Sequence, residues 1–146
     1  MAITFRYKSV NRPDGTSVRI PSIPVTLVGP RESIELIALM DSGADISVIP
    51  REVAEVLGLD LSGETESVFG LGGSVRAIPL QINMVIEKGH ECYRLNIPIK
   101  VVLDKYDFPP LLGRAGFFEE FEITLNQLEE KICLKKVDRT RSRYRP

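Results

Sequence analysis

The residues of this chain with the clearest potential for chemistry are Asp41, Ser42 and Gly43, which follow a run of apolar residues. A carboxylate is costly to bury without partners, so an Asp directly after an apolar strand needs an explanation. Gly43 lets the backbone pass close to that carboxylate, and Ser42 can donate a hydrogen bond. An isolated Asp-Ser-Gly is usually only a turn. Here a second apolar run, residues 46–49, follows at once, which favours a functional site.

Two later segments add to this motif. Leu111, Leu112 and Gly113 repeat the pattern of two apolar residues and a glycine before a short helical stretch, and residues 70–73 form a glycine-rich cluster. With these landmarks in this order over residues 23–135, the sequence resembles the retropepsin-like aspartic peptidases, which are single-lobe relatives of pepsin found in retroviruses and in cellular proteins. The first and third landmarks are the specific part of the resemblance.

The resemblance implies an all-β fold, a closed β-barrel of the acid-protease type with two short helices, whose two copies form one active site across a two-fold axis. It implies that Asp41 is the catalytic carboxylate, that Ser42 hydrogen-bonds across the axis, and that Gly43 touches the substrate main chain. The other substrate-binding positions that it implies are Ala44, Asp45, Gly70, Leu71, Gly72 and Gly73. Those that it implies for structural support are Leu112, Gly113 and Arg114.

Residues 67–79 (SVFGLGGSVRAIP) include three glycines around an apolar tip. Such a hairpin can bend over a bound peptide and expel water, as mobile lids do. An ordinary hairpin turn fits the residues equally well, and the order of the family's landmarks favours the flap.

A physical argument for pairing stands beside the resemblance. Two carboxylates held within about 3 Å cannot both ionise comfortably, so they share a proton. The charged member takes a proton from a water that attacks the peptide carbonyl, and the protonated member polarises the carbonyl oxygen. The sequence holds a single Asp-Ser-Gly. We therefore expect a homodimer that hydrolyses peptides or unfolded proteins, with the second carboxylate supplied by the second copy.

Asp45 stands where many viral members have an acidic residue that binds substrate backbone and pairs with an arginine, and Arg114 stands at that arginine's position. A charge-assisted bidentate bond would fasten the loop to the short helical stretch. Two unrelated surface charges are the alternative. Ile46 replaces a second acidic residue of many retroviral members, which indicates different subsite chemistry.

Other chemistries lack their residues. His90 is the only histidine and lies next to Gly89 in an expected turn, so a zinc hydrolase is not indicated. The sequence has no P-loop, nucleophile elbow or dinucleotide-binding glycine motif. We expect no metal and no other cofactor. Cys92 and Cys133 are too few for a disulfide framework, and we expect both to be buried, reduced thiols.

Short β-like runs between turn residues predict the elements that position the site. Residues 33–40 are expected to form a strand that becomes fully buried toward its end and leads into Asp41. Residues 51–57 have helical spacing, with Pro50 as the first helical residue and Gly58 as the C-cap. The other expected elements are strands at residues 3–8, 17–28, 64–69, 74–87, 91–103, 121–125 and 131–137, and a short helical stretch near 115–120.

Pro21 and Pro24 interrupt the strand expected at residues 17–28. Because a proline cannot donate to a ladder, we expect that segment to lie at an edge or to carry a bulge. The strands at 64–69 and 74–87 are expected to form a long hairpin.

Composition fits one soluble domain, since the 146 residues are 43% hydrophobic and 27% charged. No apolar run approaches the roughly 18 residues of a membrane span, and the N-terminus lacks a signal-peptide core, so we expect a cytoplasmic protein without membrane contact. The net charge of -1 gives no reason to expect nucleic acid as a general partner. We expect a single retropepsin-like domain at residues 1–137 and a basic, flexible tail at residues 138–146.

Two other functions remain open. The same fold can serve as a peptide-binding or dimerisation module with weak catalysis or none, and an Asp41→Asn variant would distinguish it from an enzyme. The chain could also be a structural β domain whose arginine-rich tail binds nucleic acid or an acidic partner. Deletion of residues 138–146 would then remove salt-sensitive binding.

Overall fold

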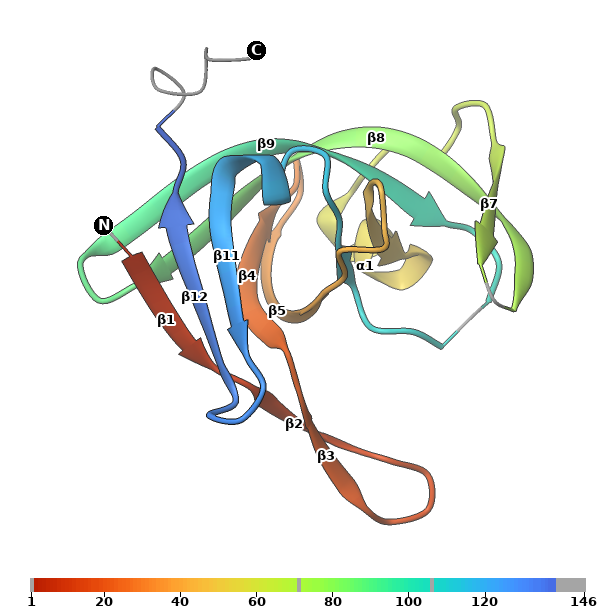
Figure 1. The fold of residues 1–146 in the computed structure, drawn as a ribbon. Helices are drawn as coiled ribbons and strands as arrows, with labels where there is room; N and C mark the ends of the chain where they lie inside the picture. Colours follow the sequence, from red (N-terminus) through yellow and green to blue (C-terminus); the bar gives the residue numbers. More distant parts are fainter. Residues whose placement is uncertain (1, 71, 106, 139–146) are drawn as a thin grey trace, which may run out of the picture.

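The computed structural model describes residues 2–70, 72–105 and 107–138. Strands dominate these residues, together with one short α-helix and one 3-10 helix, so the prediction of a mainly β fold is confirmed (Figure 1). The strands are β1 (Ala2–Arg6), β2 (Lys8–Asn11), β3 (Ser17–Ile20), β4 (Ser22–Val28), β5 (Ser33–Met40), β6 (Ser47–Pro50), β7 (Glu66–Gly70), β8 (Gly73–Lys88), β9 (Glu91–Val102), β10 (Leu111–Leu112), β11 (Phe121–Asn126) and β12 (Lys131–Lys136). The helices are α1 (Arg51–Leu57) and η1 (Phe118–Glu120).

The main sheet has seven strands in the order β4-β5-β10-β6-β9-β8-β7. Strand β4 also pairs with β8 through residues 26–28, so the hydrogen-bonded order returns from β8 to β4. A second sheet has the order β1-β12-β11. Strands β2 and β3 form a separate hairpin that projects from the body of the molecule (Figure 1).

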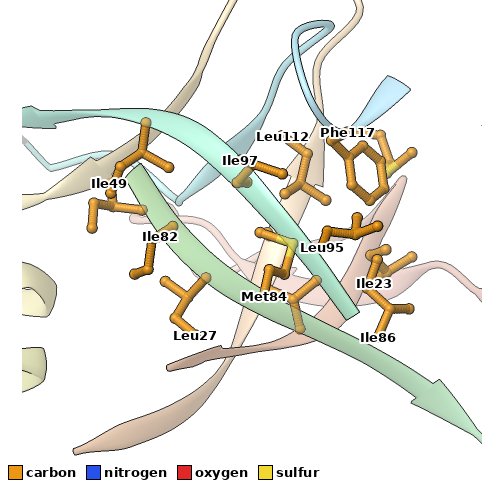
Figure 2. Close-up of a cluster of buried hydrophobic side chains, with 14 of the residues drawn as sticks. Ile23, Leu27, Ile49, Ile82, Met84, Ile86, Leu95, Ile97, Leu112 and Phe117 are labelled. Atoms are coloured by element: carbon orange, nitrogen blue, oxygen red, sulfur yellow. The ribbon is translucent and has the colours of Figure 1, made fainter. Parts of the chain in front are cut away.

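The core is built from alternate residues of the long strands. In β8, Ile82, Met84 and Ile86 are buried and the residues between them are more exposed. Figure 2 shows them in a cluster whose other labelled members are Ile23, Leu27, Ile49, Leu95, Ile97, Leu112 and Phe117. Because each such burial contributes roughly 1.5–3 kcal/mol, this cluster fixes β6 and β10, the strands that flank the site.

The N-terminal strands differ from the prediction. Residues 17–28 form two strands, which separate at Pro21. Tyr7 likewise separates β1 from β2, because its side chain is buried and its N–H donates to the carbonyl of Glu130. The edge position expected for the prolines is correct only in part. Pro24 pairs with Ile37 of β5 on one side and has no strand partner on the other within the described residues, whereas residues 26–28 of the same strand also pair with β8.

Strand β5 has the predicted bounds but not the predicted burial. Ala38 and Met40 are buried, whereas Ile37 is 40% exposed and Leu39 is half-buried. The apolar run therefore alternates between two faces, and only one face packs on the core.

Helix α1 covers residues 51–57, the segment whose spacing predicted a helix. Pro50 is its N-cap in an extended conformation and not its first helical residue. Gly58 is the C-cap with a φ of 77°, and its N–H donates to the carbonyls of Ala54 and Glu55. A left-handed conformation of this kind favours glycine. The second expected helix is the single 3-10 turn η1.

The expectation of two buried thiols is wrong for Cys92, which is exposed, and Cys133 is only half-buried. Cys92 follows the β8–β9 turn and lies on the outer face of β9, which explains its exposure. Within the described residues, no helix is long and apolar enough to cross a membrane. Most of the predicted basic tail, residues 139–146, lies outside the part that the structure describes.

Candidate active site

Asp41 lies where β5 ends, and two neighbouring elements hold its backbone. Strand β10 runs parallel to β5, with Leu112 opposite Met40. The N–H of Asp41 donates to the carbonyl of Leu112 at 3.0 Å, which continues this ladder by one residue. The apolar pair of the third landmark therefore fixes the position of the aspartate.

The residues after Asp41 form a tight turn around its carboxylate. The N–H of Gly43 donates to Oδ1 of Asp41 at 3.0 Å, and the N–H of Ala44 donates to the Asp41 carbonyl at 3.1 Å. A Cβ on Gly43 would lie 3.2 Å from Oδ1, so a side chain there would crowd the carboxylate. Asp41 is half-buried, whereas Ser42 and Gly43 are exposed. The turn thus presents the carboxylate at a surface that another molecule can reach.

Gly113 crosses this loop at very short range. A Cβ at Gly113 would meet the backbone carbon of Ile46 at 2.5 Å and the backbone nitrogen of Ser47 at 2.8 Å. The N–H of Gly113 donates to Oγ of the buried Ser47 at 2.9 Å. Sequence reasoning missed Ser47, whose only signal is that it is the polar residue within the apolar run 46–49.

Arg114 contacts the Asp41 loop, but not through the partner that the sequence indicated. Its Nη1 donates to the carbonyl of Ser42 at 2.7 Å. The described ion pairs include none between Arg114 and Asp45, whose Oδ1 instead accepts from the N–H of Ile46 at 2.9 Å. Two backbone bonds join the segments: Arg114 N–H to the Ala44 carbonyl and the following N–H to the Asp45 carbonyl. The bidentate pair is therefore a wrong prediction for a single copy of the chain.

Strands β7 and β8 form the predicted glycine-rich hairpin. These strands pair from Glu66 opposite Ala77 to Gly70 opposite Gly73. Gly73 has a φ of 109°, a backbone conformation that residues with a side chain rarely adopt. Leu71, which the resemblance placed among the substrate contacts, lies outside the described residues.

One cleft, with a volume of about 590 Å³, separates the Asp41 loop from this hairpin. Of the residues predicted for the site, it is lined by Asp41, Gly43, Ala44, Asp45, Gly70, Gly72 and Gly73. Of the other predicted residues, the cleft lining does not include Ser42, Leu112, Gly113 or Arg114. The remaining lining residues are mainly apolar: Ile46, Val48, Val68, Phe69, Val75, Lys100, Val102, Phe108 and Leu111. Sequence reasoning missed Lys100, which belongs to a strand without a motif, and Phe108, which lies three residues before Leu111 but outside the matched pattern.

The loop that carries Phe108 is attached to β8 at its start. The backbone N–H of Arg76 donates to Oδ2 of Asp104 at 2.8 Å, and the guanidinium donates to Oδ1 at 2.9 and 3.2 Å. These bonds, first the backbone one and then the side-chain ones, hold the pKa of Asp104 below its ordinary value. The side of the cleft formed by Phe108 is therefore tied to the strand that carries the hairpin.

Known proteins resemble this chain in fold and in sequence. The chain is similar over 92% of its length to a solved structure described as a retropepsin-like aspartic protease from Rickettsia conorii, of which 91% is covered, with a TM-score of 0.59 and 22% identity. At that identity the likeness shows a shared fold. The sequence model of the family described as aspartyl protease matches residues 23–114, which include the Asp41 loop, the hairpin and Gly113. The chain therefore belongs to the aspartyl protease family.

Proposed function

We propose that this protein is an aspartic endopeptidase that works as a homodimer, with a water activated between the two Asp41 carboxylates. The observation that carries the proposal is the position of Asp41. Its half-buried carboxylate lines a cleft of about 590 Å³ together with a glycine-rich hairpin.

The unused hydrogen-bonding groups of the Asp41 loop support the proposal of a homodimer. Oδ1 of Asp41 is engaged by Gly43, while its second oxygen has no hydrogen-bond partner among the residues described. The Ser42 side chain is exposed, and its hydroxyl has no bonded partner in the described part of the chain. A second copy that approaches this surface brings its own Asp41 beside the first and gives the Ser42 hydroxyl a backbone group to bond.

The chemistry then needs only protein groups and water. The ionised Asp41 accepts a proton from the water as its oxygen attacks the carbonyl carbon, and the protonated Asp41 of the second copy donates to the carbonyl oxygen. Collapse of the tetrahedral intermediate breaks the C–N bond. The departing nitrogen takes the proton that the first Asp41 accepted from water, and a hydroxyl of the intermediate returns its proton to the Asp41 of the second copy. A free acid and an amine leave as products, and the pair again holds one proton.

The cleft fits a peptide in extended form. Its lining is mainly apolar, and the hairpin offers backbone groups at the edge strand β7. An added strand gains affinity from backbone hydrogen bonds and selectivity from pockets for alternate side chains. Unfolded segments are therefore the substrate class that this site favours.

The test compares the native chain with Asp41→Asn during incubation with a denatured protein from pH 3 to pH 8. We expect fragments only from the native chain, because the amide cannot accept the proton from water. Peptide binding and the melting temperature should be retained in Asp41→Asn, which removes misfolding as an explanation. A native chain that binds peptides and cleaves none at any of these pH values would instead be a non-catalytic binding module.

A further inference from the structure

Lys100 is the only cationic residue among the described residues that line the cleft. It belongs to β9, where its neighbours in the ladder are Val48 of β6 and Pro79 of β8. Its side chain is only 17% exposed. A lysine this enclosed needs a reason, because most lysines keep their ammonium group in water.

The alternation of β9 directs Lys100 toward the cleft. Ile99 and Val101 belong to the hydrophobic core, whereas Lys100 and Val102 line the cleft. Successive side chains of a strand point to opposite faces, so the core residues on either side fix the face that Lys100 occupies. The ammonium group is therefore held at the cleft by the packing of the strand.

Lys100 has one described partner. Its Nζ lies 3.1 Å from Oε1 of Glu66, the first residue of β7, and the Glu66 side chain is 44% exposed. An ammonium group has three donors, and this single contact engages one of them at most. In the described part of the chain, Lys100 makes no other hydrogen bond or ion pair. The remaining donors are available to a group that enters the cleft.

The other charged side chains of the cleft indicate which kind of substrate group Lys100 would bind. The remaining ionisable side chains in its described lining are Asp41 and Asp45, both acidic. An acidic substrate side chain is repelled near them and attracted near Lys100. The apolar residues beside Lys100, which include Val48 and Val102, exclude water and strengthen that attraction.

We propose that Lys100 is a specificity-determining residue that selects an Asp or Glu side chain of the substrate at the position facing β9. The inference rests on the proposed function, since it requires a peptide in the cleft. Glu66 competes with the substrate carboxylate for the same ammonium group and so limits the preference. Removal of the Glu66 charge should therefore strengthen the selection of acidic peptides.

The experiment measures binding in an Asp41→Asn background, so that selection is read without cleavage. Apolar eight-residue peptides carry Glu or its neutral isostere Gln at each position in turn, and fluorescence anisotropy gives the dissociation constants. We expect one position at which Glu binds about fivefold more tightly than Gln, as a partly enclosed ion pair of about 1 kcal/mol requires. Added Lys100→Met should reduce the ratio to near one, and added Glu66→Gln should increase it.

The matched control is Lys131→Met, since Lys131 also pairs with a glutamate, Glu129 at 3.0 Å, and does not line the cleft. It should leave the ratio unchanged. A second variant guards against misfolding of Lys100→Met: the swap Lys100→Glu with Glu66→Lys keeps an ion pair and should now favour a peptide lysine over Gln.

Three outcomes would overturn the inference: no position that prefers Glu, a preference that survives Lys100→Met, or no peptide binding at all. Cleavage of denatured protein by the chain with Asp41 intact is scored separately. Failure of catalysis therefore counts against the proposed function, and failure of selection counts against Lys100.

Discussion

Gly113 is the residue at which the two segments of the site approach most closely. A methyl group there would lie 2.5 Å from the backbone carbon of Ile46. Backbone cannot rotate away as a flexible side chain can, so Gly113→Ala should push β10 from the Asp41 loop. Overpacking of this kind costs about 1–3 kcal/mol. Denaturant unfolding should show that loss in the free energy of unfolding, and peptidase activity should fall with it.

Gly63→Ala is the matched control for Gly113→Ala. The nearest atom to a Cβ at Gly63 is Cγ2 of Ile78 at 3.7 Å, an ordinary contact. This variant should be neutral or slightly more stable, because alanine lowers the entropy of the unfolded chain. Equal stability of the two variants would contradict the crossing geometry.

Sequence reasoning at this scale identified backbone-driven features better than side-chain partners. The small residues of the Asp41 loop and Gly113 follow from steric demands that leave few alternatives. The guanidinium of Arg114 donates to the Ser42 carbonyl and not to Asp45. The partner of a guanidinium depends on which acceptors already have a backbone donor. The Asp45 carboxylate, for example, already accepts from the N–H of Ile46.

At the scale of elements, the loop between β9 and β10 depends on one carboxylate. Arg76 holds the pKa of Asp104 below its ordinary value of 3.8, first through its backbone N–H and then through its guanidinium. A lowered pKa in the folded state means that the stabilisation is complete above pH 3.8 and is lost as the pH falls through the lower folded value. Asp104→Asn should therefore lower the melting temperature at pH 6 and have a shrinking effect below pH 3.8.

Asp107→Asn provides the control for that pH series. Asp107 lies in the same loop, is exposed, and has no bonded partner among the described residues. Its replacement should leave the melting temperature close to the native value throughout. If the difference between native protein and Asp104→Asn stays constant from pH 6 to pH 2, ionisation of Asp104 beside Arg76 does not stabilise the fold.

The hairpin of β7 and β8 gives a second prediction for an element. Phe69 lines the cleft and is 81% exposed, so the free chain gains little from it. Phe69→Ala should change the free energy of unfolding by less than about 0.5 kcal/mol. It should raise KM about three- to tenfold, because a bound peptide loses an apolar contact with the hairpin. The control is Leu128→Ala, at a residue that is 95% exposed and outside the cleft lining, which should change neither the free energy of unfolding nor KM. An unaltered KM in Phe69→Ala would mean that the hairpin does not contact the bound substrate.

The elements themselves were largely predictable. Strand β5 has the predicted bounds, and helix α1 covers the segment whose spacing predicted a helix. The prediction failed where the chain changes partners within one apolar run, as at Pro21, since pairing depends on strands distant in the sequence. Lys100 could not be assigned to the cleft for the same reason, because its place follows from the alignment of β9 beside β6.

At the scale of the whole molecule, one copy of the chain supplies half of the proposed chemistry. The single Asp-Ser-Gly gives one carboxylate, and the exposed turn at Ser42 and Gly43 leaves that carboxylate accessible to a second copy. Subunits of a two-fold dimer present the same surface to each other, so identical loops meet at the axis. The activity of a mixture of native and inactive chains therefore reports the number of chains in the active unit.

Native protein and Asp41→Asn are mixed in equal amounts, refolded together, and compared with native protein at the same total concentration. Random pairing puts about one quarter of the dimers in the native form, and mixed dimers lack one of the two carboxylates. The initial rate of peptide cleavage should therefore fall to about one quarter. An inert protein in place of Asp41→Asn dilutes the native chain without joining it, so the rate should then be about one half. A rate of one half in both mixtures would mean that each chain cleaves peptides alone, and the proposal of a shared aspartate pair would fail.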